Sequence, residues 1–166
     1  MIIRHAGLIA RRLGGCWRGV LIEGGSGTGK SELALRALEA GFRLVADDRT
    51  LIWASGGAVF GRAPRPLAGL IEARGQGILR ESPIDLAQIV LVAHLAAVPR
   101  AIERLPEAAT ADLAGLPVPR LVIDAGTLSA PARLRRAMEH LGAARQQAYQ
   151  ACPLGGEASR RDRGYP

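Results

Sequence analysis

The chain has 166 residues and a formal net charge of +7, with 48% hydrophobic but only 4% aromatic residues. This length and composition suit one globular domain with an aliphatic core, and they exclude an intrinsically disordered chain. No apolar run reaches the roughly 20 residues of a membrane-spanning helix, and the first residues lack the pattern of a secretory signal peptide. We therefore expect a cytoplasmic protein with no membrane partner.

The positive charge suggests a nucleic-acid partner as one explanation. The arginines, however, are dispersed along the chain, and aromatic side chains that would stack on bases are nearly absent. A basic surface would equally attract an acidic protein or the phosphates of a nucleotide. We expect no nucleic-acid partner.

In the first part of the chain, several predicted strands precede and follow one predicted helix. The predicted strands cover residues 2–8, 20–22, 42–46, 50–53 and 58–60. Residues 13–19 predict a turn, and Ser55-Gly56-Gly57 predicts the turn of a hairpin. Residues 31–40 predict a helix, because leucine and alanine recur along one side and Gly41 is a natural stop.

Regular elements are predicted to be sparser in the second part. Residues 69–78 are interpreted as strand plus loop, residues 89–95 and 121–123 as strands, the proline-containing stretch 99–119 as irregular, and residues 130–141 as a helix. We expect one catalytic domain over residues 1–150 and a flexible Arg-rich tail over residues 151–166.

A glycine-rich segment follows the strand at 20–22. Gly24-Gly25-Ser26-Gly27-Thr28-Gly29-Lys30-Ser31 fits the phosphate-binding pattern G-x-x-x-x-G-K-[ST]. Lys30 is the only lysine in the chain, and its compact ammonium suits β- and γ-phosphates better than a planar guanidinium would. A chance match is expected in roughly one chain in a hundred of this length. The order strand, loop and helix nevertheless predicts phosphate binding, with the Ser31 hydroxyl on Mg²⁺.

Two adjacent carboxylates, Asp47-Asp48, follow the strand at 42–46. Ligands of open α/β sheets bind beyond the carboxyl ends of the strands. Neighbouring side chains point to opposite sides of a strand, so the two carboxylates would divide the work. One would reach the nucleophile or the metal, and the other would orient it or face solvent. The alternative is an ordinary polar turn.

Glu72 and Arg74 lie among three glycines in residues 69–78. One interpretation is an exposed ion pair of little energetic value. The glycines favour a functional role, because they allow the backbone to approach a ligand or to turn tightly. Glu72 is then a candidate for completing a Mg²⁺ site.

Three blocks of residues together resemble the HPr kinase/phosphorylase family, in its short form without the N-terminal domain. They are His5 on the first strand, the glycine-rich loop with Glu32, and Val45-Ala46-Asp47-Asp48-Arg49 together with residues 69–78. The last block contains Glu-x-Arg-Gly-x-Gly-Ile, which is far more specific than the phosphate loop alone. The similarity covers residues 2–142.

The resemblance implies an α/β fold, namely a P-loop kinase-type domain with a mixed β-sheet and flanking helices. It also implies an enzyme that uses ATP and Mg²⁺ to phosphorylate a serine of the phosphocarrier protein HPr. The same family removes that phosphate by phosphorolysis, and its members form homo-oligomers such as hexamers.

The resemblance also implies roles for individual residues. Lys30 would be the phosphate lysine, and Ser31 and Glu72 would hold Mg²⁺. Asp48, with Asp47 beside it, would take the proton of the serine and return it in the reverse reaction. Two further matches are His5, to an active-site histidine, and Arg104, to an active-site arginine that follows a longer segment in the family.

Two other functions stay open. A phosphoenolpyruvate carboxykinase-like enzyme has a related loop and acidic pair, but it is much longer. A nucleotide-sensing regulatory module with little or no phosphoryl transfer would fit the lack of the family's Pro-Val-x-x-Gly-Arg-Asn loop, where this chain has Ile123-Asp124-Ala125-Gly126-Thr127. Asp48 favours an enzyme, because a sensor has no need of a base.

Overall fold

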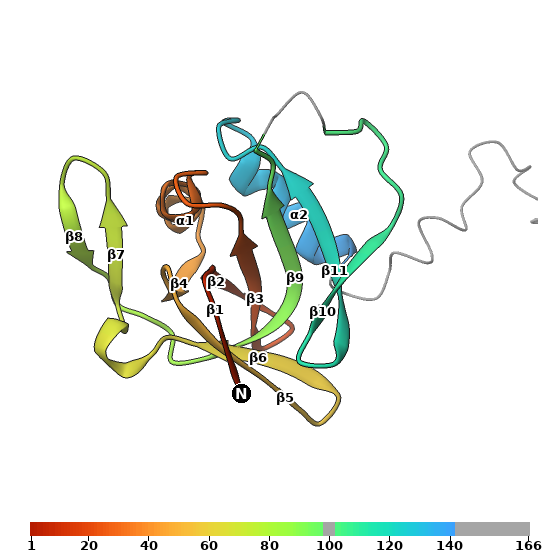
Figure 1. The fold of residues 1–166 in the computed structure, drawn as a ribbon, viewed down its shortest axis with the longest axis horizontal. Coiled ribbons are helices and arrows are strands. Elements are labelled where there is room, and N and C mark those ends of the chain that lie inside the picture. The colour runs from red at the N-terminus through yellow and green to blue at the C-terminus, as the bar shows by residue number, and fades with distance from the viewer. Residues whose placement is uncertain (98–101, 142–166) are drawn as a thin grey trace, which may run out of the picture.

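A curled mixed sheet forms the body of the molecule, and the computed structural model describes residues 1–97 and 102–141 (Figure 1). The strands are β1 (Ile2–Arg4), β2 (Gly7–Leu13), β3 (Cys16–Glu23), β4 (Arg43–Ala46), β5 (Thr50–Ser55), β6 (Ala58–Arg62), β7 (Leu70–Ala73), β8 (Gly77–Arg80), β9 (Ala87–Leu95), β10 (Ala109–Leu113) and β11 (Leu116–Ile123). The helices are α1 (Lys30–Glu39), α2 (Ala130–His140) and the short 3₁₀ helix η1 (Arg65–Leu67).

Four strands of the sheet run in the same direction and end at the same edge. The main path is β1-β5-β6-β9-β3-β2-β4, and β11 joins β9 on the side away from β3. Strands β3, β9 and β11 are parallel, and β4 runs in the same direction because both β3 and β4 are antiparallel to β2. The loops that follow these four strands therefore meet at one edge, where open α/β sheets bind ligands.

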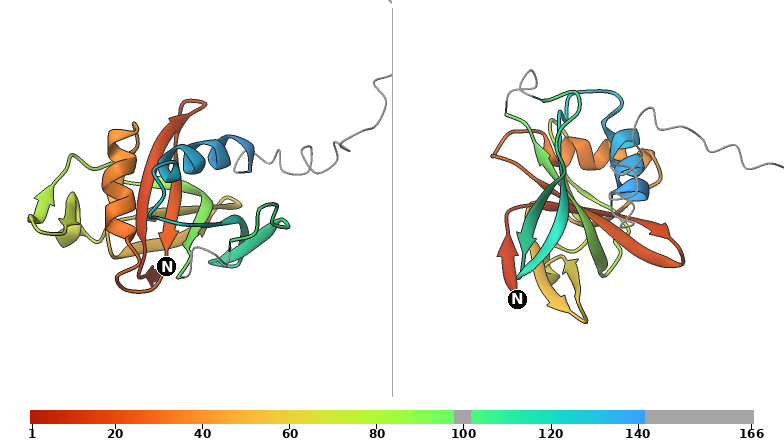
Figure 2. Two further views of the ribbon diagram at one scale, coloured as in Figure 1. Left: turned by 90° about the horizontal axis from the view of Figure 1, so that it is seen from above. Right: turned by 90° about the vertical axis from the view of Figure 1, so that its right-hand side faces the viewer.

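The two faces of the sheet are buried in different ways. Helices α1 and α2 lie on the same side of the central strands (Figure 2), and Leu33 and Leu134 are among the buried residues that they contribute. The opposite face closes on itself, because Leu8, Leu21 and Ile52 pack together from three different strands. Alternate residues of one strand thus serve different cores, as the period of two requires.

The expected α/β fold, with a mixed sheet and flanking helices, is confirmed, and so are the helix at 31–40 and the hairpin around Gly56-Gly57. The single strand expected over residues 2–8 is wrong. The chain breaks at His5 and Ala6, and the buried Thr50 hydroxyl donates a hydrogen bond to the Ala6 carbonyl at 2.7 Å. This break sends β1 to β5 and β2 to β3 and β4.

The irregular stretch expected over residues 99–119 is wrong from residue 109 onward, where β10 and β11 form a hairpin. Pro117 and Pro119 lie in the half of β11 that pairs with β10 alone, whereas the parallel pairing with β9 begins at Arg120. A proline removes one ladder donor, which a strand tolerates where one side has no partner. The expected tail over residues 151–166 lies outside the described residues.

No helix within residues 1–97 and 102–141 is long and apolar enough to cross a membrane.

Candidate active site

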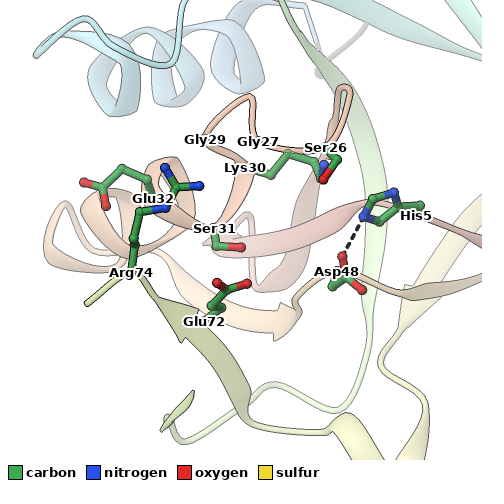
Figure 3. Close-up of a pocket in the computed structure, with 10 residues that line it drawn as sticks. All are labelled: His5, Ser26, Gly27, Gly29, Lys30, Ser31, Glu32, Asp48, Glu72 and Arg74. Carbon is green, nitrogen blue, oxygen red and sulfur yellow. Dashed lines mark hydrogen bonds and ion pairs between the residues drawn. The ribbon is translucent and has the colours of Figure 1, made fainter. Parts of the chain in front are cut away.

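The glycine-rich loop joins β3 to α1 at the edge of the sheet where β3, β4, β9 and β11 end (Figure 3). Gly27 and Gly29 have φ angles of 76° and 89°, which residues with a Cβ rarely adopt, and Gly29 caps the N-terminus of α1. At Gly24 the reason for glycine is space, since a Cβ there would lie 2.7 Å from Thr28 Oγ1 and 3.0 Å from Leu95 Cβ. The loop is therefore fitted closely to its neighbours before any ligand arrives.

Lys30 bends back over this loop. Its Nζ donates hydrogen bonds to the Gly24 carbonyl at 3.0 Å and the Gly25 carbonyl at 2.9 Å, and the residue is only 8% exposed. Positive charge from Lys30 and the free N–H groups at the start of α1 thus converge on the same concave surface. Such a surface is suited to anions.

Asp47 is held inside the site rather than at its opening. The Ser31 hydroxyl donates to Asp47 Oδ1 at 2.9 Å and Oδ2 at 3.0 Å, and the Glu72 backbone N–H donates to Oδ2 at 3.1 Å. The residue is 7% exposed, and this burial raises the pKa of the carboxylate despite the hydrogen bonds that stabilise the charged form. A buried carboxylate on the loop serine suits a metal-binding role.

Asp48 occupies a different environment. Its φ of 61° and the 2.7 Å hydrogen bond from the Arg49 N–H to the Asp47 carbonyl define a γ-turn centred on Asp48. Such a turn costs roughly 1–3 kcal/mol and persists where the surroundings enforce it, often at functional sites. The turn directs the Asp48 carboxylate to His5, whose Nε2 lies 2.6 Å from Oδ1. Both side chains are more than half exposed.

The hairpin β7–β8 closes the other side of the site. Ile71 and Ala73 are buried and anchor it, while Glu72 and Arg74 lie beside the phosphate loop (Figure 3). The hollow enclosed has a volume of about 260 Å³, and Lys30, Ser31, Asp48 and His5 also line it. Pockets that enclose a drug-sized ligand span about 300–1,000 Å³, so this hollow suits the phosphate end of a nucleotide rather than the whole molecule.

Most of the residues singled out in the sequence meet in this hollow. Asp47 lies directly behind it on Ser31, and Glu32, which belongs to the block that carries the family resemblance, is one of its lining residues. Arg104 does not join them; it is exposed in the segment between β9 and β10 and is not among the lining residues. The ion pair considered for Glu72 and Arg74 is not formed within the described part of the chain.

The segment after β11 supports the phosphate loop from behind. Arg36 of α1 donates to the carbonyls of Ala125 and Thr127, the latter at 3.0 Å. A Cβ on Gly29 would lie 3.5 Å from the Ala125 Cβ. No local pattern predicts this contact, because Arg36 and residues 124–127 are far apart in the chain.

The oxygen atoms in the hollow and directly behind it fit Mg²⁺. Mg²⁺ usually takes one or two carboxylates, keeps several waters and gains its other ligands from substrate phosphates. The Ser31 hydroxyl, the Asp47 carboxylate and the nearby Glu72 carboxylate supply such a partial set. The described residues contain no cluster of three or more His, Cys, Asp or Glu side chains that could hold a metal ion.

Comparison with known proteins gives consistent matches. The family model described as the HPr Serine kinase C-terminal domain matches residues 16–127. The HPr kinase/phosphorylase of Leptothrix cholodnii is 41% identical over 122 residues, covering 65% of this chain and 38% of that protein. The protein of the same name from Bordetella pertussis is 39% identical over 116 residues, covering 63% and 38%. The chain thus spans little more than a third of the length of these relatives.

A solved structure shows the same fold. The HPr(Ser) kinase/phosphatase from Coxiella burnetii superimposes on this chain with a TM-score of 0.70 at 22% sequence identity. The match covers 91% of this chain and 100% of that chain. It confirms the expected P-loop kinase-type fold.

Proposed function

The chain belongs to the family of the HPr serine kinase C-terminal domain, and on that premise we propose that it transfers the γ-phosphoryl group of ATP to a serine of HPr. The observation that carries the proposal is the position of the His5–Asp48 pair, which lines the same hollow as the phosphate loop. A nucleotide-binding module without transfer has no use for an exposed carboxylate held there in a strained turn. We further propose that residues 1–150 form one catalytic domain and that it acts in the cytoplasm, where ATP is available.

The proposed reaction uses each part of the hollow differently. Lys30 and the N–H groups at the start of α1 bind the β- and γ-phosphates. Ser31, Asp47 and Glu72 would hold Mg²⁺, which supplies charge neutralisation at the phosphates when bound. Asp47 is thus added to the metal ligands expected from the sequence. It contacts Ser31 in the way that an acidic residue contacts the phosphate-loop serine in other nucleotide-binding proteins.

Asp48 acts on the acceptor. The serine oxygen forms a bond to the γ-phosphorus while the bond from that phosphorus to the β–γ bridging oxygen breaks, and ADP leaves. The hydroxyl proton passes to the Asp48 carboxylate, and His5 holds that carboxylate in place from the other side. In the reverse direction, an oxygen of inorganic phosphate attacks the phosphoserine phosphorus while the bond from that phosphorus to the serine oxygen breaks. Asp48 returns the proton to the serine oxygen, and pyrophosphate leaves.

The direct test is incubation of the protein with labelled ATP, Mg²⁺ and HPr from the same source. Label is expected on a serine of HPr with the wild-type protein, and Lys30→Ala is expected to abolish transfer and to weaken nucleotide binding. Nucleotide binding without transfer under all conditions would instead support a sensing module. Phosphorolysis has its own assay, in which phosphate is added to phosphorylated HPr and pyrophosphate is measured.

A further inference from the structure

A second hollow lies against the His5–Asp48 pair. Its volume is about 390 Å³, and it is lined by Ile3, His5, Asp48 and Arg49. The phosphate-site hollow is also lined by His5 and Asp48, so the two spaces meet at this pair. The residues lining the second hollow have no part in the binding of phosphates described above.

Ile3 and Arg49 line the second hollow but not the phosphate site, and both are exposed. Ile3 is 63% exposed, and it lies on β1, which pairs with β5 alone among the strands described. Arg49 is exposed and forms no salt bridge within the described part of the chain, whereas the nearby Arg4 lies 4.0 Å from Glu23. An exposed aliphatic side chain and an unpaired guanidinium thus flank the opening to Asp48.

In-line transfer decides which space serves which substrate. The attacking oxygen and the leaving oxygen must lie on opposite sides of the transferred phosphorus. The leaving group is the nucleotide bound at the phosphate loop, so the acceptor oxygen must approach from the far side. The second hollow meets the phosphate site at His5 and Asp48, and no residue of the phosphate loop lines it.

We propose that the second hollow is the acceptor subsite and that Ile3 and Arg49 determine which protein segment enters it. The inference rests on the proposed kinase function and adds the chemistry of the substrate. The acceptor serine lies in a segment that also presents an aliphatic side chain to Ile3 and a carboxylate to Arg49. A guanidinium binds a carboxylate with two parallel hydrogen bonds, which fixes the orientation of the segment as well as its affinity.

The alternative role for Arg49 is contact with the transferred phosphoryl group. The two roles differ in kinetics. A residue that binds the acceptor changes KM for the acceptor and leaves nucleotide affinity unchanged, whereas a residue that stabilises the transition state lowers kcat. An exposed ion pair is also weakened by salt.

The experiment uses HPr as the acceptor and compares Arg49→Gln and Ile3→Ser with two matched controls. Arg12→Gln removes an exposed arginine at the far end of β2, and Ile2→Ser changes the neighbouring residue of β1, whose side chain points to the other face. We measure KM for HPr, kcat, KM for ATP, and the dissociation constant of HPr in the presence of a non-hydrolysable ATP analogue. The binding measurement does not depend on transfer.

Each of the two variants is expected to raise KM and the dissociation constant for HPr by roughly three- to tenfold, which corresponds to a weak exposed contact. The KM for ATP and both controls should stay at wild-type values. The salt dependence of HPr binding should be shallower in Arg49→Gln than in the wild type.

The outcomes separate this inference from the proposed function. Normal HPr affinity in both variants, with wild-type transfer intact, overturns the acceptor subsite alone. A fall in kcat without a change in HPr affinity assigns Arg49 to the phosphoryl group and also overturns it. If the wild type binds HPr without phosphorylating it and the variants weaken this binding, the kinase proposal is contradicted, and the contacts of Ile3 and Arg49 with HPr are supported. If the wild type neither binds nor phosphorylates HPr, both proposals are wrong.

Discussion

Gly24 and Gly25 are adjacent in the phosphate loop, yet they should respond very differently to alanine. A Cβ on Gly24 would lie 2.7 Å from Thr28 Oγ1 and 3.0 Å from Leu95 Cβ, distances at which the neighbours must move. A Cβ on Gly25 would meet only Thr28 Cγ2, at an ordinary 3.6 Å. Gly25→Ala is therefore a control that changes the same loop by the same methyl group.

The expected cost follows from overpacking. Inserting a carbon into a close-packed region typically costs about 1–3 kcal/mol. For a chain of this size each kcal/mol lowers the thermal midpoint by about 2–4 °C, so Gly24→Ala should melt roughly 2–12 °C below the wild type. The Gly24 carbonyl accepts a hydrogen bond from Lys30 Nζ at 3.0 Å, so displacement of the loop should also weaken ADP binding by about tenfold.

Circular dichroism melting and calorimetric titration with ADP and Mg²⁺ would measure both effects. Gly25→Ala should stay within about 2 °C of the wild type and bind ADP normally. Removing the clashing hydroxyl in the double variant Gly24→Ala/Thr28→Ala should recover part of the lost stability relative to the sum of the single changes. Equal destabilisation by Gly24→Ala and Gly25→Ala would refute the argument from close approach.

Two further variants test the division of labour between the acidic residues. His5→Ala removes the partner that holds Asp48 and should lower kcat by about ten- to hundredfold with KM for ATP unchanged, as steady-state kinetics would show; an unchanged kcat contradicts a positioning role. Asp47→Asn removes a buried charge whose pKa is raised, while its oxygen can still accept from Ser31. Because ionised Asp47 destabilises the fold above its unfolded pKa, the variant should melt higher than the wild type near pH 7, and the difference should vanish in acid, where both states are protonated. The same variant should lose Mg²⁺-dependent transfer; a lower melting point at pH 7 would show that burial is not the dominant effect.

Local signals in the sequence were enough for several elements. The helix after the phosphate loop was predictable because its apolar residues recur with helical spacing and Gly41, with φ of 86°, ends it. The hairpin around Gly56-Gly57 was predictable because both glycines adopt the positive φ that a two-residue turn requires. These features depend only on residues close in the chain.

Other features depend on residues far apart in the chain. The break at His5-Ala6 is stabilised by Thr50, and the strand at Pro117 exists because β10 pairs with one side of it. Neither partner can be identified from local propensity. At Pro117 local propensity even predicts an interruption, because proline lacks a backbone N–H.

The two acidic residues show the same limit within the site. The residue pattern predicted that Asp47 and Asp48 would point in different directions, and only the family resemblance assigned Asp48 to the nucleophile. The directions differ because Asp48 has a positive φ, a conformation that non-glycine residues adopt only when their surroundings enforce it. The contacts with Ser31 and His5 then follow from the fold.

The most direct test of the central claim is the transfer of label from ATP to HPr by the wild type and by Asp48→Asn, measured together with nucleotide binding. Asparagine keeps the shape of the side chain, so ADP and Mg²⁺ should bind both proteins alike. Transfer should fall at least about a hundredfold in the variant, because the amide cannot accept the serine proton. Wild-type rates of transfer by Asp48→Asn would contradict the account.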